Sequence, residues 1–259
     1  MSRFGNLEFS NEHEDQSHGQ PQPALKGEAH YLAEAQSAFE NGNFESALRL
    51  FAKVLEFNPQ NPVAWTGQVR MLIELGEFGE ARLWADKALE KFPHEPELLA
   101  AKAVALARNG DLQGALAFSD SAIEERGDTP YVWLARGDVL LARKEARADF
   151  CFEKALAFAP KDWFLLWLTG RIRFYYRQFA LAVRLMQQAV EANTGHFLLW
   201  LELGRCQQAL GLAGPARHSY TQAQQLQPKH PDVTRAFREL ADVNLFSQFW
   251  RWCRNLLPR

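Results

Sequence analysis

Apolar side chains recur along the chain with the spacing of one face of an α-helix. In the stretch ESALRLFAKVLEFNPQ, the residues Ala47, Leu48, Phe51, Val54 and Leu55 fall at i, i+1, i+4, i+7 and i+8, which line one side of a helix. Short turns with glycine or polar residues, such as NGN, LGE and NGD, separate these segments, and a proline often follows. Glycine favours the left-handed conformation that ends a helix, and proline cannot continue one. The pattern therefore predicts short antiparallel pairs of helices.

The predicted helix pairs repeat with a period of about 34 residues. One series consists of alanines with gaps of 34, 34, 33, 34 and 34 residues: Ala47, Ala81, Ala115, Ala148, Ala182 and Ala216. A second series consists of small residues with gaps of 34, 34, 34, 33 and 34: Ala35, Val69, Ala103, Gly137, Gly170 and Gly204. Both series lack one residue between Gly137 and Ala148. Because a helix pair cannot bury its apolar face alone, the repeats are expected to stack on a continuous core.

These units resemble the tetratricopeptide repeat family. The unit WLELGRCQQALGLAGPARHSYTQAQQLQP, residues 200–228, has the Trp, Leu-Gly, Ala, Tyr, Ala and Pro of the family in the family's order. The fourth unit departs from the pattern, because ARKEARADF lacks the glycine of the turn and is one residue short. The resemblance implies an all-α fold, a right-handed superhelical solenoid of about six helix pairs followed by capping and amphipathic helices. The predicted repeats are residues 28–61, 62–95, 96–129, 130–162, 163–196 and 197–230.

The segments that flank the repeats differ from them in composition. Residues 1–27 are rich in Gln, Glu, Ser and His, and they are predicted to form a disordered tail because they cannot bury enough apolar surface. Residues 231–244 are predicted to form a helix that caps the last repeat.

Residues 245–259 are predicted to form an amphipathic helix with an aromatic face and a basic face. Its candidate contact residues are Phe246, Phe249, Trp250, Arg251, Trp252 and Arg254. Burial against the last repeat, or against the same helix of a second copy in a homodimer, is one expectation for the aromatic face. The other is an anionic membrane surface, since aromatic residues opposite arginines are typical of an interfacial helix.

Composition and motifs narrow the class of protein. The chain of 259 residues has a net charge of −2, which argues against a nucleic-acid partner. Three scattered cysteines lack the spacing of a disulfide framework or a zinc site. The start of the chain lacks the apolar core of a signal peptide, and no apolar run is long enough for a membrane span, so a cytoplasmic protein is expected. Because phosphate-binding, hydrolase and metalloprotease motifs are absent, neither catalysis nor a cofactor or metal ion is expected.

The resemblance also implies which side chains line the inner wall of the superhelix. The C-terminal half of this wall is crowded with aromatic residues around two arginines, and Trp, Tyr and Arg carry much of the binding energy at protein interfaces. The candidate partner-binding residues are Arg70, Phe164, Trp167, Arg171, Phe174, Tyr175 and Arg205. Their side chains are expected to point away from the helix stack, and core packing is the alternative. Asp138 on the same wall is expected to be a charge of this wall or a capping residue.

The sequence therefore predicts a non-catalytic adaptor or scaffold that binds a partner protein or filament through the superhelix. The alternative is a peripheral membrane linker that uses residues 245–259 to tether a cytoplasmic, cytoskeletal assembly to a membrane. In its general layout, a polar tail, a compact array and a basic aromatic end, the chain is similar to the bacterial kinesin-light-chain-like proteins associated with bacterial tubulins. This resemblance implies a tubulin-like filament as the partner.

Overall fold

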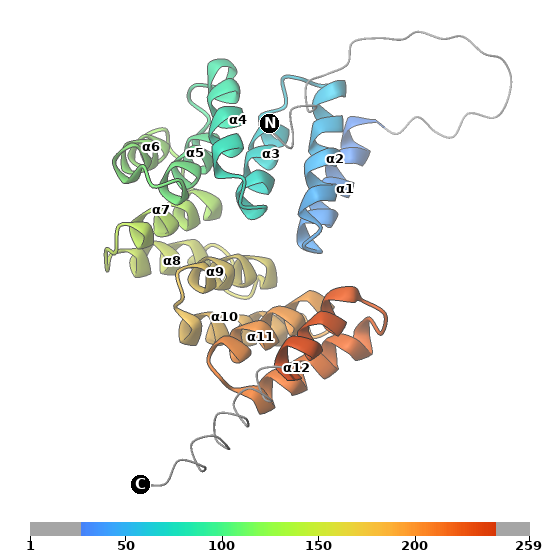
Figure 1. The fold of residues 1–259 in the computed structure, drawn as a ribbon. Helices are drawn as coiled ribbons and strands as arrows, with labels where there is room; N and C mark the ends of the chain where they lie inside the picture. The colour runs from blue at the N-terminus through green and yellow to red at the C-terminus, as the bar shows by residue number, and fades with distance from the viewer. Residues whose placement is uncertain (1–26, 242–259) are drawn as a thin grey trace, which may run out of the picture. The chain divides into compact units, whose positions relative to one another are not determined.

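A computed structural model of the chain describes residues 27–241. The predicted amphipathic helix at 245–259 and nearly all of the predicted tail lie outside this range. The described residues form α-helices and no β-strand, and the helices follow one another as antiparallel pairs (Figure 1). The predicted all-α fold of helix-pair repeats is therefore confirmed.

The helices of these pairs have similar lengths and are joined by short turns. The pairs are α1 (Glu28–Glu40) and α2 (Phe44–Phe57), α3 (Pro62–Glu74) and α4 (Phe78–Lys91), α5 (Pro96–Arg108) and α6 (Leu112–Glu124), α7 (Pro130–Ala142) and α8 (Ala148–Ala157), α9 (Trp163–Tyr175) and α10 (Phe179–Ala192), and α11 (Phe197–Ala209) and α12 (Ala213–Leu226). A further helical segment begins at residue 231 and continues to the end of the described range.

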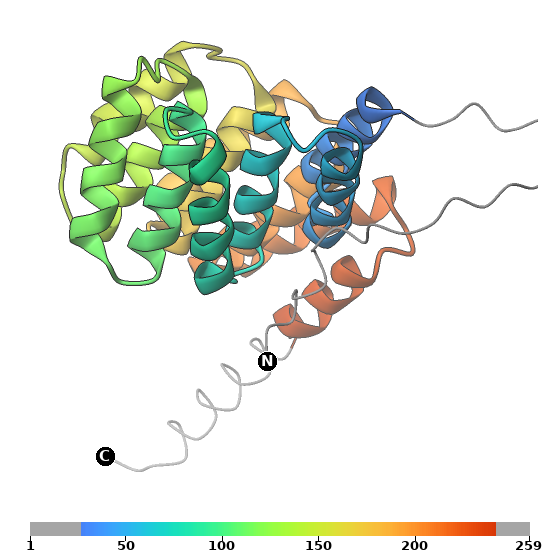
Figure 2. The same cartoon turned by 90° about the horizontal axis from the view of Figure 1, so that it is seen from above.

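The chain divides into two compact units, with the boundary between Ala155 and Leu156. Unit 1 holds α1 to α7 and most of α8, and unit 2 holds α9 to α12 and segment 231–241. Within each unit, neighbouring helices pack on each other in chain order (Figure 2). In unit 1, the first helices α3, α5 and α7 also contact one another. Side chains from consecutive repeats therefore meet along these first helices.

Small residues allow the two helices of a pair to approach closely. The six alanines of the 34-residue series are all buried. A Cβ atom on Gly137 would lie 2.6 Å from the Phe152 ring, and one on Gly170 would lie 2.8 Å from the methyl carbon of Met186. Each contact joins a first helix to the second helix of the same pair, which explains why the repeat requires small residues there.

Replacing Ala115 with leucine should lower the free energy of unfolding by about 1–3 kcal/mol, because a larger side chain overpacks the core. Ala115 has no exposed surface and lies in a cluster with Ala103, Leu106 and Val139. Urea denaturation followed by circular dichroism measures the loss. Ala117→Leu is the matched control, since Ala117 is exposed on the same helix. Equal stability of Ala115→Leu and the wild type would contradict this packing.

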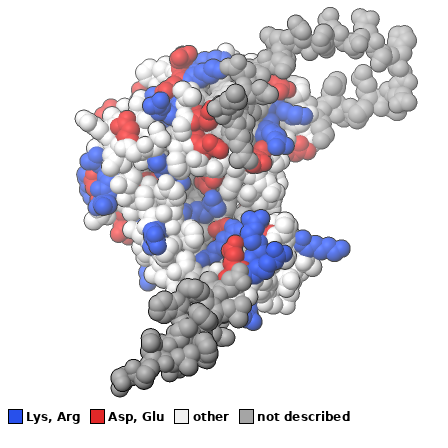
Figure 3. Space-filling view, viewed as in Figure 1, with Lys and Arg blue, Asp and Glu red and all other residues white. Residues whose placement is uncertain are grey.

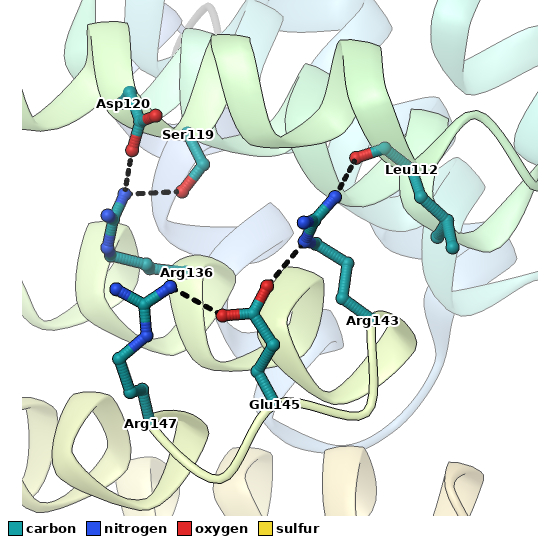
Figure 4. A network of polar contacts seen from close by, with 7 residues as sticks. All are labelled: Leu112, Ser119, Asp120, Arg136, Arg143, Glu145 and Arg147. Atoms are coloured by element: carbon teal, nitrogen blue, oxygen red, sulfur yellow. Dashed lines mark hydrogen bonds and ion pairs between the residues drawn. The ribbon is translucent and has the colours of Figure 1, made fainter.

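The turn between α7 and α8 lacks the glycine found in four other repeats, as does the turn between α9 and α10, where Arg177 has φ 60°. Lys144 has φ 59° and takes the left-handed position that Gly42, Gly76, Gly110 and Gly211 occupy elsewhere, with φ between 72° and 96°. Figure 4 shows the polar contacts that hold this turn. Glu145 accepts hydrogen bonds from Arg143 at 2.6 Å and from Arg147 at 2.5 Å. These bonds lower the pKa of Glu145 because they stabilise its charged carboxylate.

Replacing Lys144 with glycine should raise the free energy of unfolding by about 1 kcal/mol, because a side chain is unfavourable at this backbone conformation. Lys144→Ala keeps the Cβ atom and should bring no such gain. Thermal and urea unfolding of the three proteins give the comparison. A gain for alanine equal to that for glycine would show that the lysine side chain, and not its backbone conformation, destabilises the turn.

Candidate functional site

Two of the predicted arginines in unit 2 are joined by a carboxylate. Arg205 on α11 donates a hydrogen bond from Nη1 to Oε1 of Glu202 at 2.8 Å, and Nη1 of Arg171 on α9 lies 3.8 Å from the same oxygen. Glu202 is only 9% exposed. Nη2 of Arg205 also lies 4.0 Å from Oδ2 of Asp232, the second residue of segment 231–241. The network therefore links consecutive first helices of unit 2.

The remaining predicted residues of unit 2 differ in exposure. Tyr175 is 45% exposed, and it follows Arg171 by one helical turn, so both side chains lie on the same side of α9. Phe164 and Phe174 are partly buried, and the ring of Phe174 packs 5.3 Å from that of Phe179. We call the surface that comprises Phe164, Arg171, Tyr175 and Arg205 the inner face of unit 2. Figure 3 shows basic and acidic side chains side by side on the surface of this unit.

Trp167 does not point away from the helix stack, contrary to the sequence-based expectation. Its exposed fraction is 0%. The ring of Phe164, three residues earlier, lies 5.5 Å from the indole, and the guanidinium carbon of Arg171, four residues later, lies 5.1 Å from its centroid. Large neighbours at i−3 and i+4 share one helix face with the indole and contact it. In this structure, Trp167 is therefore a packing residue.

Arg70 belongs to unit 1 and contacts aromatic rings of its own chain. Its guanidinium carbon lies 3.9 Å from the centroid of the Tyr131 ring and 5.0 Å from that of Phe39. These contacts link α3 with α7 and α1 in cation–π geometry. Arg70 is thus held by aromatic rings of unit 1.

The sequence did not predict the ion pair of Arg108 and Asp138 in unit 1. Nη2 of Arg108 donates to Oδ2 of Asp138 at 2.6 Å, and Nε donates to Oδ1 at 3.3 Å. The two side chains are 8% and 2% exposed. The pair joins the end of α5 to the middle of α7, so Asp138 is a structural charge between first helices. Glu202 was also not predicted, although its position three residues before Arg205 is typical of an ion pair on one helix face.

The described part of the chain gives little support for a reactive thiol, a metal site or a membrane span. Burial raises the pKa of the Cys151 and Cys206 thiols, which disfavours a reactive thiolate. Within residues 27–241, no cluster of His, Cys, Asp and Glu side chains is suited to a metal ion. None of the helices in that range is long and apolar enough to cross a membrane. The candidate contact residues between Phe246 and Arg254 lie outside the described residues.

Comparisons with known proteins agree with the helix-pair architecture. Models of the tetratricopeptide repeat family match residues 38–105 and 85–130. No curated protein matches the sequence with statistical significance. The family matches over residues 38–130, together with the repeated helix pairs, support a tetratricopeptide repeat protein. Such proteins generally mediate protein–protein interactions and are typically non-catalytic.

Three solved structures illustrate the likeness in fold. A chain of the APC/C heterotetramer Cut9–Hcn1 is 15% identical with a TM-score of 0.51, and the match covers 84% of this chain but only 43% of that one. TTC0263, a TPR protein of Thermus thermophilus, is 18% identical with a TM-score of 0.50, covering 83% and 99%. PilW, a type IV pilus biogenesis factor, is 17% identical with a TM-score of 0.50, covering 81% and 98%. At these identities the likeness shows the fold alone.

Proposed function

We propose that this chain is a non-catalytic adaptor that binds an extended segment of a partner protein on the inner face of unit 2. The observation that carries the proposal is the pair of arginines that share Glu202 beside the exposed Tyr175. Arginine and tyrosine are common anchors of protein interfaces. The resemblance to bacterial kinesin-light-chain-like proteins suggests a tubulin-like filament as the partner.

The contacts of Glu202 support this proposal because they restrain the two arginines before a partner arrives. A guanidinium has five N–H donors, and the hydrogen bond from Arg205 to Glu202 uses one of them. We expect N–H groups of this arginine pair to donate to a carboxylate or a backbone carbonyl of the partner. Restrained side chains lose less conformational entropy on binding. The Tyr175 ring adds an apolar surface one turn away from Arg171.

The proposal predicts that Tyr175→Ala combined with Arg205→Ala weakens partner binding by at least ~2 kcal/mol, the usual threshold for a hot spot. The partner is first captured from the native cytoplasm with the full chain, and its Kd is then measured by calorimetry. The matched control is Arg184→Ala with Arg217→Ala, because both arginines are exposed on the second helices α10 and α12. A double variant that binds as tightly as the wild type would place the partner elsewhere.

The composition of residues 245–259 favours a second candidate function, a peripheral membrane linker. This segment has three arginines, four aromatic residues and no acidic residue. Three arginines at about 1 kcal/mol each would favour anionic over neutral vesicles by roughly a hundredfold. Liposome flotation of the full chain at low salt tests this function, and deletion of residues 245–259 should abolish flotation. Failure of the full chain to float with anionic vesicles would reject the linker.

A further inference from the structure

The turns that join the two helices of each pair differ in composition between the two units. Each such turn of unit 1 has a carboxylate in it or directly beside it, namely Glu40, Glu77, Asp111 and Glu145. The corresponding turns of unit 2 have the sequences YRQ at 176–178 and LGL at 210–212. Neither residues 163–190 nor residues 203–231 contain an Asp or a Glu. The turns of unit 2 are therefore apolar and basic, with no acidic residue near them in the sequence.

These two turns expose large apolar side chains at one edge of unit 2. Leu210 is 40% exposed, Leu212 is 44% exposed, and Leu181, near the start of α10, is 37% exposed. Arg177 is exposed beside them in the sequence, and Tyr176 is partly buried. Tyr176 and Leu210 are spaced by 34 residues, so they occupy the same position in consecutive repeats. We call the surface that comprises Tyr176, Arg177, Leu181, Leu210 and Leu212 the turn edge of unit 2.

The last described helical segment of the chain ends at this same edge. Segment 231–241 packs on α12, where the ring of Phe237 lies 5.8 Å from that of Tyr220. The helices α9 and α11 and this segment run in one direction, and α10 and α12 run in the opposite direction (Figure 1). The ends of α9, α11 and segment 231–241 therefore lie at the turn edge. Arg238 and Glu239, both exposed near the end of the segment, carry opposite charges and leave the charge balance of this edge unchanged.

The composition of the turn edge suits a surface of anionic lipids. Tyrosine is enriched at membrane–water interfaces, exposed leucines enter the boundary between headgroups and acyl chains, and arginines are attracted by anionic headgroups. Carboxylates such as those in the turns of unit 1 would be repelled there. Beyond residue 241 the chain continues through Asp242 into residues 245–259, which have three arginines, four aromatic residues and no acidic residue. The chain thus leaves the described fold at the turn edge and ends in a sequence of the same character.

We infer that the turn edge of unit 2 contacts an anionic lipid surface together with residues 245–259. Leu210 and Leu212 enter the boundary between headgroups and acyl chains, and the guanidinium of Arg177 lies at the level of the phosphate groups. The inference rests on the second candidate function, the peripheral membrane linker. It deepens that function, because a folded surface of the repeats, and not the last residues alone, then binds the membrane.

Partitioning of the full chain onto vesicles of equal parts phosphatidylserine and phosphatidylcholine tests this inference. Arg177→Gln combined with Leu212→Ser should lower the partition coefficient about tenfold, because a cation and an apolar side chain are both lost from the lipid contact. The matched control is Lys229→Gln with Leu226→Ser, at the opposite edge of unit 2, where Leu226 is 42% exposed. The control removes the same charge and the same apolar side chain, and it should bind like the wild type. Circular dichroism checks that both variants are folded.

Photo-crosslinking from the turn edge separates this inference from the linker function itself. Benzoylphenylalanine at position 210 should form adducts with lipid on the same vesicles, and benzoylphenylalanine at position 226 should not. If the full chain does not bind the vesicles, the linker function and the inference are both rejected. If the full chain binds and deletion of residues 245–259 abolishes binding, the linker function stands. The inference is then overturned by wild-type binding of the Arg177→Gln, Leu212→Ser variant, or by adducts of position 210 with protein and not with lipid.

Discussion

Replacing Asp138 with alanine should lower the free energy of unfolding by about 3–5 kcal/mol, the usual cost of removing one partner of a buried ion pair. The substitution leaves the Arg108 guanidinium, which is only 8% exposed, without the carboxylate that accepts two of its hydrogen bonds. Arg108→Ala should cause a comparable loss of stability, since it leaves the buried carboxylate of Asp138 without the guanidinium that donates to it. Urea denaturation followed by circular dichroism at neutral pH measures both variants.

A double variant separates the cost of an unpaired charge from the value of the pair. Arg108→Met combined with Asp138→Leu should recover most of the lost stability, because apolar side chains of similar size often replace a buried ion pair without loss. Arg49→Ala is the exposed control, since Arg49 and Glu45 lie 3.9 Å apart with both side chains largely exposed, and it should change stability far less. If Asp138→Ala unfolds like the wild type, the pair is effectively solvated.

The helix-pair fold could be predicted because the spacing of apolar and small residues determines which helix faces are buried. Ala47, Leu48 and Phe51 were expected on one helix face, and all three are buried. The alanine series predicted that two helices approach each other closely at Ala115, and Ala115 has no exposed surface. Both features depend on the 3.6-residue period and the 34-residue period, which are visible in a single sequence.

Contacts between long side chains could not be predicted in the same way. Periodicity places a residue on a helix face, but it does not show how far the side chain reaches along that face. Arg70 contacts Tyr131, which lies 61 positions later in the chain and two repeats away. The partner of Asp138 lies at the end of the preceding first helix. Such contacts depend on stacking geometry that the repeat pattern does not contain.

The turn of the fourth repeat shows a second limit of prediction from the sequence. Glycine is the usual signal of a left-handed turn residue, and ARKEARADF lacks it. The structure forms the turn with Lys144 at φ 59°, and the hydrogen bonds from Arg143 and Arg147 to Glu145 hold the loop. Polar side chains thus replace the usual turn residue. The charged residues of the segment were visible in the sequence, but their mutual geometry was not.

Replacing Trp167 with alanine should lower the free energy of unfolding by about 3–5 kcal/mol, as expected when a large buried aromatic side chain is truncated. Trp167 has no exposed surface and lies against Phe164 and Arg171. Chemical denaturation followed by circular dichroism is the suitable measurement, because the substitution itself alters the tryptophan fluorescence. The two units can unfold in separate transitions, and the loss should appear in the transition of unit 2.

Tyr175→Ala provides the matched control on the same helix, because Tyr175 is 45% exposed and surface substitutions usually change stability by less than about 0.5 kcal/mol. Trp167→Ala should therefore lower stability, whereas Tyr175→Ala should lower partner affinity. If Trp167→Ala instead keeps its stability and loses the partner, the indole becomes accessible in solution. Trp167 would then be an anchor of the inner face, and the burial described here would belong to the unbound state alone.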